Sequence, residues 1–480
     1  MAGYAALLTL FVTGVAAWLV LRFVRKRLAV GEATAVERRF QRTVAMWNAE
    51  VDRFKFTAQG AVITLLNHDH AVWTHVEAMA RTTGEPLARL RWKVYGYVDE
   101  IVPFFKPLSY YGVGYRVARW LLNRLYRVEF DPGELDRIRN LSSERPRSVV
   151  YVMNHRSNVD YVLAAYVLRE SIALSFAVGE WARIWPLEYV FKSFGSYFIR
   201  RGYRDPLYHT VLRRYVQLVT KNGVTQALFP EGGLSRDGRL RAPKLGLLDY
   251  IICSKEDRSF DRELVFVPVA INYDRVLEDR QLVAELRDER PPRGRWRMLK
   301  NAGSILFGNA RKYTRGQIKR HGIAAVRFGE PVSFDTWHAA QKVDIFALDK
   351  VDRRGHIAEL TNLLMERIAA LVPATPLCVV AKVLLARGPV SRDALVDHVR
   401  AEGERLRAKG VLVVGWDRGA EWIALGALER FKMRHLVLET PDRVEPVQSE
   451  LPILRYYASS LAHFDDGIVP KVEPPRAEKH

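Results

Sequence analysis

A histidine and an aspartate stand five residues apart directly after an apolar run, a spacing that suits acid–base chemistry. The run Val149–Met153 predicts a buried strand, and a helix is expected to begin near Ser157 or Asn158, either of which can cap it. His155 then lies at the carboxyl end of a strand and Asp160 in the first turn of a helix. The carboxylate could orient one ring nitrogen while the other faces a substrate. On its own, such a pair is more often a structural hydrogen bond.

A second apolar run ends at Phe229 and leads into a glycine-rich turn followed by arginines. Gly232 and Gly233 permit close approach of the backbone, whose amide groups can surround an anion. Arg236 and Arg239 add forked donors suited to phosphate. Without other evidence, the segment could also be a surface turn with solvated charges.

Two further apolar strands end in polar groups in the same way. Gly195–Arg201 is a short strand that ends in two arginines, and Val265–Tyr273 is a buried strand that leaves into a polar loop. The order of the four strands, each with polar groups at its exit, is more informative than any one of them.

These segments resemble the four sequence blocks of the glycerolipid acyltransferases, the family with a histidine, four variable residues and an aspartate. The residues of these blocks are similar to those of the glycerol-3-phosphate and dihydroxyacetone-phosphate acyltransferases and less like those of the shorter lysophosphatidate acyltransferases. Weaker similarity extends to residues 454–463. The matched blocks are Asn154–Asp160, Gly195–Arg201, Phe229–Arg236 and Val267–Tyr273.

The resemblance implies transfer of an acyl group from acyl-CoA or acyl-carrier protein (acyl-ACP) to the sn-1 hydroxyl of glycerol 3-phosphate, giving lysophosphatidate. His155 is then the general base and Asp160 the acid that orients it. Arg236 and Arg200 are expected to hold the phosphate, and no metal or further cofactor is implied. The residues expected to bind substrate are Arg200, Glu231, Gly232, Ser235, Arg236 and Pro268.

Two other functions remain open. Dihydroxyacetone phosphate or lysophosphatidate could be the acceptor, because both need the same base and nearly the same phosphate pocket. The chain could instead be a basic membrane-binding scaffold without catalytic activity.

One position departs from the family's third block. The family usually carries an arginine where this chain has Leu234. Either one phosphate-facing guanidinium is missing, or Leu234 points into the core and another cation substitutes for it. The candidates for that substitution are Arg200, Arg201, Arg239 and Lys244.

The composition fits an anionic partner. The 480 residues carry a formal net charge of +20, with a pI near 9.9. Such a charge suits an anionic phospholipid membrane or acidic substrates, whereas no nucleic-acid partner is expected because no zinc-finger, helix-turn-helix or RNA-recognition signature occurs. The two cysteines, Cys253 and Cys378, stand in apolar surroundings and favour a reducing compartment.

The amino-terminal segment predicts a membrane anchor. Residues 2–21 carry no charged side chain and are followed at once by basic residues, an arrangement typical of a transmembrane helix with the rest of the chain in the cytoplasm. The expected location is therefore the cytoplasmic side of the inner membrane.

Alternation of apolar strands and helical segments predicts an α/β fold, with an acyltransferase-type core, a helical amino-terminal region and a small helical carboxyl-terminal region. The expected segments are an anchor with its basic flank at 1–30, a helical region at 31–145, the α/β domain at 146–335, a helical linker at 336–372, a helical region at 373–469 and a disordered tail at 470–480.

Overall fold

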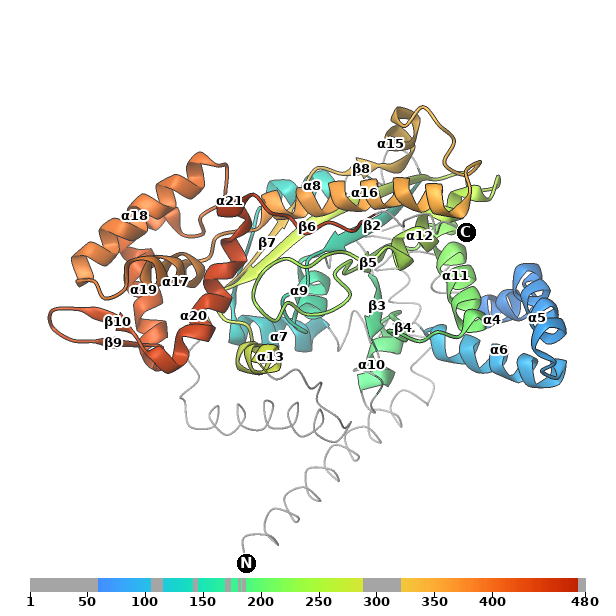
Figure 1. Ribbon diagram of the computed structural model, residues 1–480, viewed down its shortest axis with the longest axis horizontal. Helices are drawn as coiled ribbons and strands as arrows, with labels where there is room; N and C mark the ends of the chain where they lie inside the picture. Colours follow the sequence, from blue (N-terminus) through green and yellow to red (C-terminus); the bar gives the residue numbers. More distant parts are fainter. Residues whose placement is uncertain are drawn as a thin grey trace, which may run out of the picture. The chain divides into compact units, whose positions relative to one another are not determined.

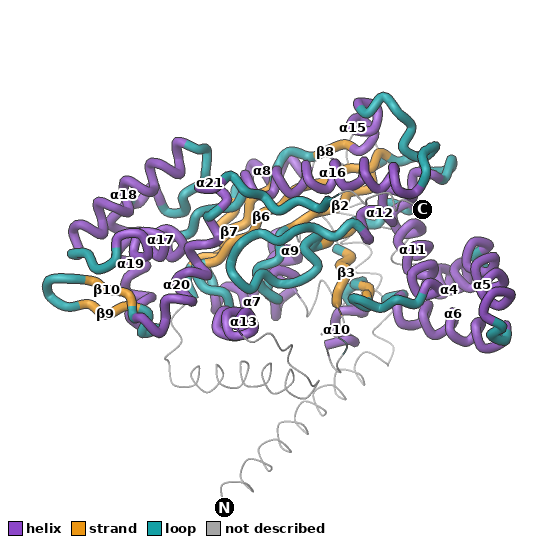
Figure 2. Tube along the Cα trace, in the orientation of Figure 1, coloured by secondary structure: helices purple, strands orange, loops and turns teal. Residues whose placement is uncertain are grey.

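The computed structural model describes residues 59–104, 115–139, 141, 146–168, 174–179, 183, 187–287 and 321–473. The chain divides into two units, residues 1–51 and 52–480, and every described residue belongs to the second unit. Figures 1 and 2 show how its helices and strands are arranged.

Within the described residues, an eight-stranded mixed sheet carries helices on both faces (Figure 1). Its order is β1-β7-β6-β2-β5-β3-β4, and β8 also pairs with β6. Strands β2 to β6 are parallel, whereas β7 and β8 run antiparallel to β6 and β1 runs parallel to β7. The strands are β1 (Arg127–Phe130), β2 (Arg147–Met153), β3 (Ser175–Gly179), β4 (Tyr197–Ile199), β5 (Gln226–Leu228), β6 (Glu263–Tyr273), β7 (Ile323–Phe328) and β8 (Val332–Ser333).

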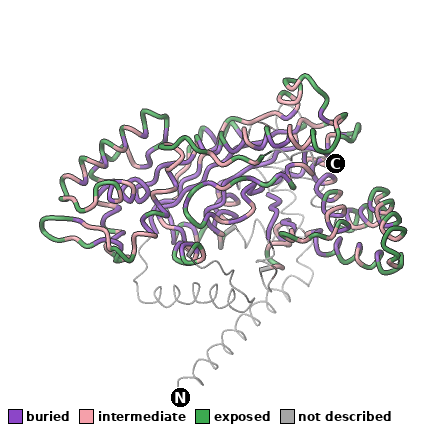
Figure 3. The backbone as a smooth tube through the Cα atoms, in the orientation of Figure 1, coloured by how far each residue is buried: buried purple, intermediate pink, exposed green. Residues whose placement is uncertain are grey.

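The central strands are buried on both faces (Figure 3). In β2, Val149, Tyr151 and Met153 pack into one hydrophobic cluster, while Val150 and Val152 pack into another. This alternation follows from the two-residue period of a strand, and burial on both sides is expected of parallel strands between two helical layers.

Each cluster is completed by its own set of helices. The first layer contains α7 (Tyr115–Leu125), α8 (Pro132–Arg139), α9 (Asp160–Val167), α10 (Leu187–Ser193), α13 (Asp279–Arg287), α17 (Pro376–Arg387), α18 (Arg392–Ala408), α19 (Ala420–Met433) and α20 (Leu451–Ala458). The second contains α4 (Gln59–Asn67), α5 (His70–Thr83), α6 (Leu87–Ile101), α11 (Pro206–Lys221), α12 (Gly246–Ile252), α15 (Phe334–Ala340) and α16 (Lys350–Leu371).

Several shorter elements complete the described chain. A hairpin pairs β9 with β10, and α21 follows α20 near the end of the described chain. Their bounds, with those of four 3₁₀ turns, are β9 (Val437–Glu439), β10 (Val444–Pro446), α21 (His463–Asp466), η4 (Cys253–Glu256), η5 (Trp416–Arg418), η6 (Gln448–Glu450) and η7 (Ser459–Leu461).

The carboxyl-terminal helices are bonded to the end of β6. The Asn272 Nδ2 donates to the Pro373 carbonyl (2.9 Å), and the Leu377 N–H donates to Asp274 Oδ1 (3.1 Å). Asp274 is fully buried and its other oxygen accepts from the Ile323 N–H (2.9 Å). Helices α17 to α20 therefore share the core of the sheet.

The predicted fold class needs one correction. The α/β core is present, but no helix within the described ranges is both long and apolar enough to cross a membrane. The 22-residue α16 has sufficient length, yet charged side chains interrupt it, whereas a span needs about 20 mainly apolar residues. The segment predicted as the anchor, residues 1–30, lies outside the described residues. The predicted segment boundaries stay predictions.

Candidate active site

Three loops meet at one edge of the sheet, because β2, β5 and β6 are adjacent and parallel and their carboxyl ends share that edge. β2 leads into Asn154 and His155, β5 leads into the glycine-rich turn, and β6 ends at Tyr273. The Asn154 Nδ2 donates to the Ile271 carbonyl (2.9 Å), and the Ile271 N–H donates back to Asn154 Oδ1 (2.8 Å). This reciprocal pair fixes the exit of β2 against β6.

His155 and Asp160 form the expected pair. The His155 Nδ1 lies 3.0 Å from Asp160 Oδ2, which also accepts from the N–H groups of Arg156 (2.7 Å) and Ser157 (3.0 Å). The second oxygen, Oδ1, accepts from the Tyr273 hydroxyl (2.6 Å). Because a carboxylate only accepts hydrogen bonds, this arrangement assigns the imidazole proton to Nδ1 and leaves Nε2 as the basic nitrogen.

The helix of this motif begins at Asp160, later than the predicted start near Ser157 or Asn158. These two residues instead form a turn that is held by Glu278. The Ser157 hydroxyl donates to Glu278 Oε2 (2.7 Å), and the Asn158 N–H donates to Oε1 (3.2 Å). Burial raises the pKa of Glu278 above its usual value. The turn therefore depends on a residue that lies far away in the sequence.

The surroundings of His155 favour its neutral form. Its ring stacks on Phe229 with centroids 4.0 Å apart, and the Tyr161 ring meets it edge-on at 5.5 Å. Burial lowers the pKa of His155, and the charges of Arg201 and Arg241 act in the same direction, against the raising effect of the aspartate. Within the described residues, Nε2 has no hydrogen-bond partner, so the proton-accepting nitrogen of this buried ring is not engaged by another side chain.

Glu231 connects the histidine loop to the glycine-rich loop. Its Oε1 accepts from the His155 N–H (3.0 Å) and its Oε2 from the Arg241 N–H (2.9 Å). Only 2% of Glu231 is exposed, and burial raises its pKa to about 7. Glu231, predicted to bind substrate, thus uses both carboxylate oxygens to hold two backbone segments together.

Gly232 and Ser235 shape the same loop. Gly232 has a φ of +65°, a conformation that glycine adopts more readily than other residues. The Ser235 N–H donates to the His155 carbonyl (3.2 Å), and its hydroxyl donates to the Arg239 carbonyl (2.6 Å). Ser235 therefore lies beside the histidine, but its hydroxyl is bonded within the loop.

The two arginines predicted to hold phosphate each pair with a carboxylate. Arg200 donates to Glu100 from Nε (2.8 Å) and Nη2 (2.5 Å), and Arg236 donates from Nε to Glu285 Oε2 (3.2 Å). The Arg200 guanidinium also lies over the rings of Tyr97, Tyr203 and Tyr208. Both cations are thus already compensated by acidic side chains.

Pro268 lies inside the sheet. It stands opposite Val152 of β2, and its carbonyl accepts from the Gly329 N–H (2.8 Å). On the other side of β6, pairing with β8 ends at Phe266 and pairing with β7 begins at Val269. Pro268 therefore lies in the gap between two strand pairings, where a missing N–H is tolerated.

Three residues of the site carry roles that the sequence did not indicate. Tyr273 bonds Asp160, Glu278 holds the turn after His155, and Arg241 shares the Glu231 carboxylate with the histidine loop. Tyr273 ends the fourth sequence block, so its position was a usable signal. Glu278 and Arg241 lie outside the blocks and had no such signal.

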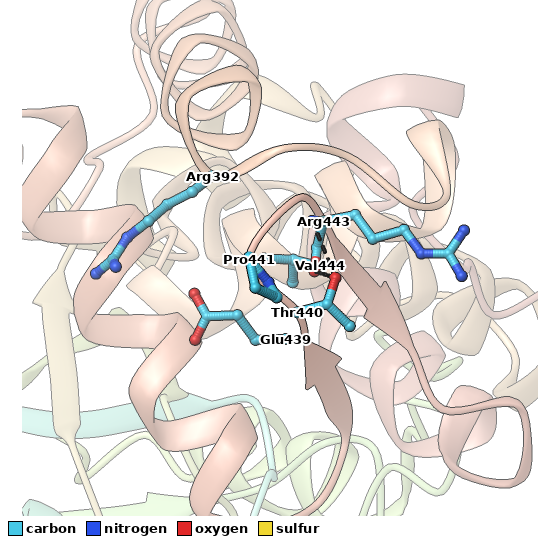
Figure 4. A pocket seen from close by; sticks show the side chains of 6 residues that line it. All are labelled: Arg392, Glu439, Thr440, Pro441, Arg443 and Val444. Atoms are coloured by element: carbon cyan, nitrogen blue, oxygen red, sulfur yellow. Dashed lines mark hydrogen bonds between the residues drawn. The ribbon is translucent and has the colours of Figure 1, made fainter.

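Two cavities lie away from these residues. One cavity, of about 320 Å³, lies at the β9–β10 hairpin. Two of the residues that line it, Arg392 and Arg443, point in opposite directions (Figure 4). Another, of about 420 Å³, is lined along α7 by Arg116, Arg119, Trp120, Asn123 and Arg124. In the described part of the chain, no three His, Cys, Asp or Glu side chains gather as metal ligands would.

Two family models match the chain. The Acyltransferase model matches residues 136–272, which include strands β2 to β5, nearly all of β6 and the His155 loop. The model for the glycerol-3-phosphate acyltransferase C-terminal region matches residues 307–464. Together they show an acyltransferase-type α/β protein.

Named relatives narrow this class. The chain is 32% identical over 330 residues to a glycerol-3-phosphate acyltransferase of Aeromonas hydrophila, covering 67% of this chain and 39% of the relative. It is 31% identical over 280 residues to one of Haemophilus influenzae, covering 58% of this chain and 33% of the relative. The chain belongs to the glycerol-3-phosphate acyltransferase family of glycerolipid acyltransferases. It spans about a third to two fifths of the length of these curated relatives.

Among solved structures, the chain is similar to the 1-acyl-sn-glycerophosphate acyltransferase PlsC of Thermotoga maritima. The identity is 20%, the likeness covers 62% of this chain and 95% of that one, and the TM-score is 0.29.

Proposed function

We propose that the protein transfers an acyl group from a thioester to the sn-1 hydroxyl of glycerol 3-phosphate, giving lysophosphatidate. The observation that carries the proposal is the buried His155–Asp160 pair at the edge where three strands end, in which no described residue is hydrogen-bonded to Nε2 of the imidazole. Support for the acceptor comes from the named relatives, which are glycerol-3-phosphate acyltransferases.

The chemistry follows from the state of the imidazole. His155 Nε2 takes the proton of the acceptor hydroxyl as the hydroxyl oxygen attacks the thioester carbonyl. Asp160 stabilises the imidazolium that forms, because its oxygen lies 3.0 Å from Nδ1. When the tetrahedral intermediate collapses, the C–S bond breaks and the thiolate accepts the proton from the imidazolium, which restores the base.

The acyl donor is acyl-CoA or acyl-ACP, used as a co-substrate without a further cofactor. Both donors are anionic and fit a chain with a net charge of +20. The same charge suits contact with an anionic phospholipid membrane, and a location at its cytoplasmic side stays a prediction.

The test is a transfer assay on the purified full chain. A labelled thioester is offered in turn with glycerol 3-phosphate, dihydroxyacetone phosphate and lysophosphatidate. We expect the highest kcat/KM with glycerol 3-phosphate. A clear preference for either of the other acceptors would reject the proposed substrate, and binding without transfer to any of them would reject the proposed activity.

Substitution of the base gives the first mutational prediction. His155→Ala should lower kcat by about 10²- to 10⁴-fold, because general base catalysis contributes that much. Asp160→Asn should also lower kcat, since an amide can no longer fix the tautomer as a carboxylate does.

The matched control is His338→Ala. The His338 ring also stacks on a phenylalanine, Phe334, and lies 3.6 Å from a carboxylate of Asp344, but it belongs to α15. This variant should keep the kcat of the unmodified chain. A folded His155→Ala protein with undiminished kcat would show that His155 is not the base.

A further inference from the structure

We infer that Arg241 supplies the guanidinium that binds the phosphate of the acceptor, in place of the side chain that Leu234 lacks. This inference rests on the proposed function and deepens it, since it names the residue that selects a phosphate monoester as acceptor. Arg241 lies outside the four sequence blocks.

The Leu234 side chain provides no charge to the site. Leu234 is half-buried and packs against the hydrophobic cluster on the first face of the sheet. The Arg241 Nη1 donates to the Leu234 carbonyl (3.1 Å). A guanidinium from position 241 therefore lies beside the backbone of the residue whose own side chain is apolar.

Two guanidinium groups converge on one glycine of this loop. A Cβ atom on Gly233 would lie 3.0 Å from Arg241 Nη1 and 3.6 Å from Arg201 Nη1. The Lys244 side chain lies over the neighbouring glycine, where a Cβ on Gly232 would be 2.9 Å from its Cδ. The glycines thus let three cations approach the loop closely.

Three cations beside the loop have no acidic partner among the described residues. Among the described residues, Arg201, Arg241 and Lys244 form no ion pair with a carboxylate. In contrast, Arg200, Arg236 and Arg239 are paired with Glu100, Glu285 and Asp466. The buried Arg156 also has no carboxylate partner in the described part of the chain, but its guanidinium is bonded to the Gly238 carbonyl and lies over the Tyr456 ring. Uncompensated positive charge in a glycine loop is suited to a dianionic phosphate.

Two of these cations, Arg201 and Arg241, act on the proposed base. The charges of Arg201 and Arg241 both act on the His155 imidazole. The backbone of Arg241 is also tied to that of His155 through the two oxygens of Glu231. A small acceptor could therefore present its hydroxyl to Nε2 while its phosphate contacts Arg241.

The experiment measures the kinetics and phosphate binding of Arg241→Leu in the full chain. Loss of a charge-assisted contact should raise the KM for glycerol 3-phosphate about tenfold or more, with a smaller change in the KM for the acyl donor. The inhibition constant of inorganic phosphate should rise in parallel. Arg241→Lys keeps the charge but loses the two-pronged guanidinium donor, so its KM for glycerol 3-phosphate should lie between those of the unmodified chain and of Arg241→Leu.

A rescue variant separates binding from folding. The double variant Arg241→Leu with Leu234→Arg returns a guanidinium to the loop and should recover most of the lost affinity for glycerol 3-phosphate. The matched control is Arg262→Leu, because Arg262 is also half-buried and its guanidinium covers a glycine, Gly223, at the opposite edge of the sheet. This control should leave the KM unchanged.

The outcomes distinguish this inference from the proposed function. If the unmodified chain acylates glycerol 3-phosphate and Arg241→Leu changes its KM by less than about twofold, Arg241 does not bind the phosphate. If the unmodified chain acylates none of the acceptors, calorimetry with inorganic phosphate still tests whether Arg241 binds phosphate. Binding that Arg241→Leu abolishes supports the site although the proposed function fails, and binding that survives the substitution overturns the site.

Discussion

The Asp160 carboxylate accepts four hydrogen bonds, from the His155 ring, two backbone N–H groups and the Tyr273 hydroxyl. Its position is therefore determined by the turn before α9 and by the end of β6 together. Because Asp160 in turn directs Nδ1 of His155, the orientation of the proposed base depends on Tyr273, a residue of a different strand.

Removal of the Tyr273 hydroxyl should change the pH profile of the enzyme. In Tyr273→Phe, Asp160 loses a hydrogen-bond donor, and its less compensated charge should raise the pKa of His155. Since only the neutral imidazole acts as a base, the acid limb of the kcat/KM profile should move to higher pH. We expect about a fivefold loss of kcat/KM at neutral pH.

The control for this prediction is Tyr126→Phe. Tyr126 is also buried and its ring lies 5.3 Å from that of Tyr273, but its hydroxyl donates to the Arg275 carbonyl (2.7 Å). A similar shift of the acid limb in both variants would mean that the effect comes from packing and not from the bond to Asp160.

At this scale, the sequence predicts local pairs better than distant ones. His155 and Asp160 are five residues apart, and a strand followed by a helix brings them together. Arg200 and its partner Glu100 are separated by 100 residues, so no local pattern could show that this arginine is already compensated. The role of Arg241 depends in the same way on how the loop folds back toward Glu231.

At the scale of elements, the glycine-rich loop after β5 contacts the carboxyl-terminal helix α20. Gly238 has a φ of +87°, and a Cβ there would lie 1.8 Å from the Tyr456 carbonyl oxygen. The Gly238 carbonyl also accepts from the Arg156 guanidinium, which lies over the Tyr456 ring. The loop that carries the proposed anion site is thus held against a helix more than 200 residues later in the chain.

Gly238→Ala should destabilise the protein. The added methyl group would meet backbone atoms that cannot rotate away, in addition to the cost of a left-handed φ, so we expect a loss of about 2 kcal/mol or more in the free energy of unfolding. Urea denaturation followed by circular dichroism measures it.

Gly410→Ala separates the two contributions. Gly410 has a similar φ of +79° but open space around its Cα, so this variant should lose about 1 kcal/mol. Equal losses in the two variants would contradict the proposed contact between the loop and α20.

The elements themselves were largely predictable. Apolar runs identified β2, β4, β5 and β6 because strands buried on both faces need continuous apolar residues. The start of α9 was less predictable, because Ser157 is engaged by Glu278 and does not cap the helix where its side chain suggested.

At the scale of the whole molecule, the carboxyl-terminal helices form part of the same hydrophobic core as the sheet. Residues of α17, α19 and α20 belong to the cluster that contains Val267 and Ile271 of β6. The buried Asp274 bonds both β7 and the start of α17. No sequence pattern indicates this union, since residues 373–469 read as a separate helical segment.

A chain that ends at Val372 should therefore fail to fold cooperatively. Its sheet would expose the part of one apolar face that α17 to α20 cover, and Asn272 and Asp274 would lose buried partners. Differential scanning calorimetry should show no cooperative transition for this variant. A chain that lacks only residues 474–480 keeps every described residue and should melt like the full protein. A cooperative transition near the native Tm in the shorter chain would contradict this view.

The Glu231 carboxylate has a consequence for how ligands are received. One oxygen binds the backbone of His155 and the other that of Arg241, so neither segment can shift without breaking a bond to the same buried group. The two segments are preorganised, and an incoming molecule does not have to spend conformational entropy on bringing them together. A single acidic side chain, Glu231, thus holds the His155 and Arg241 segments in place before a ligand binds.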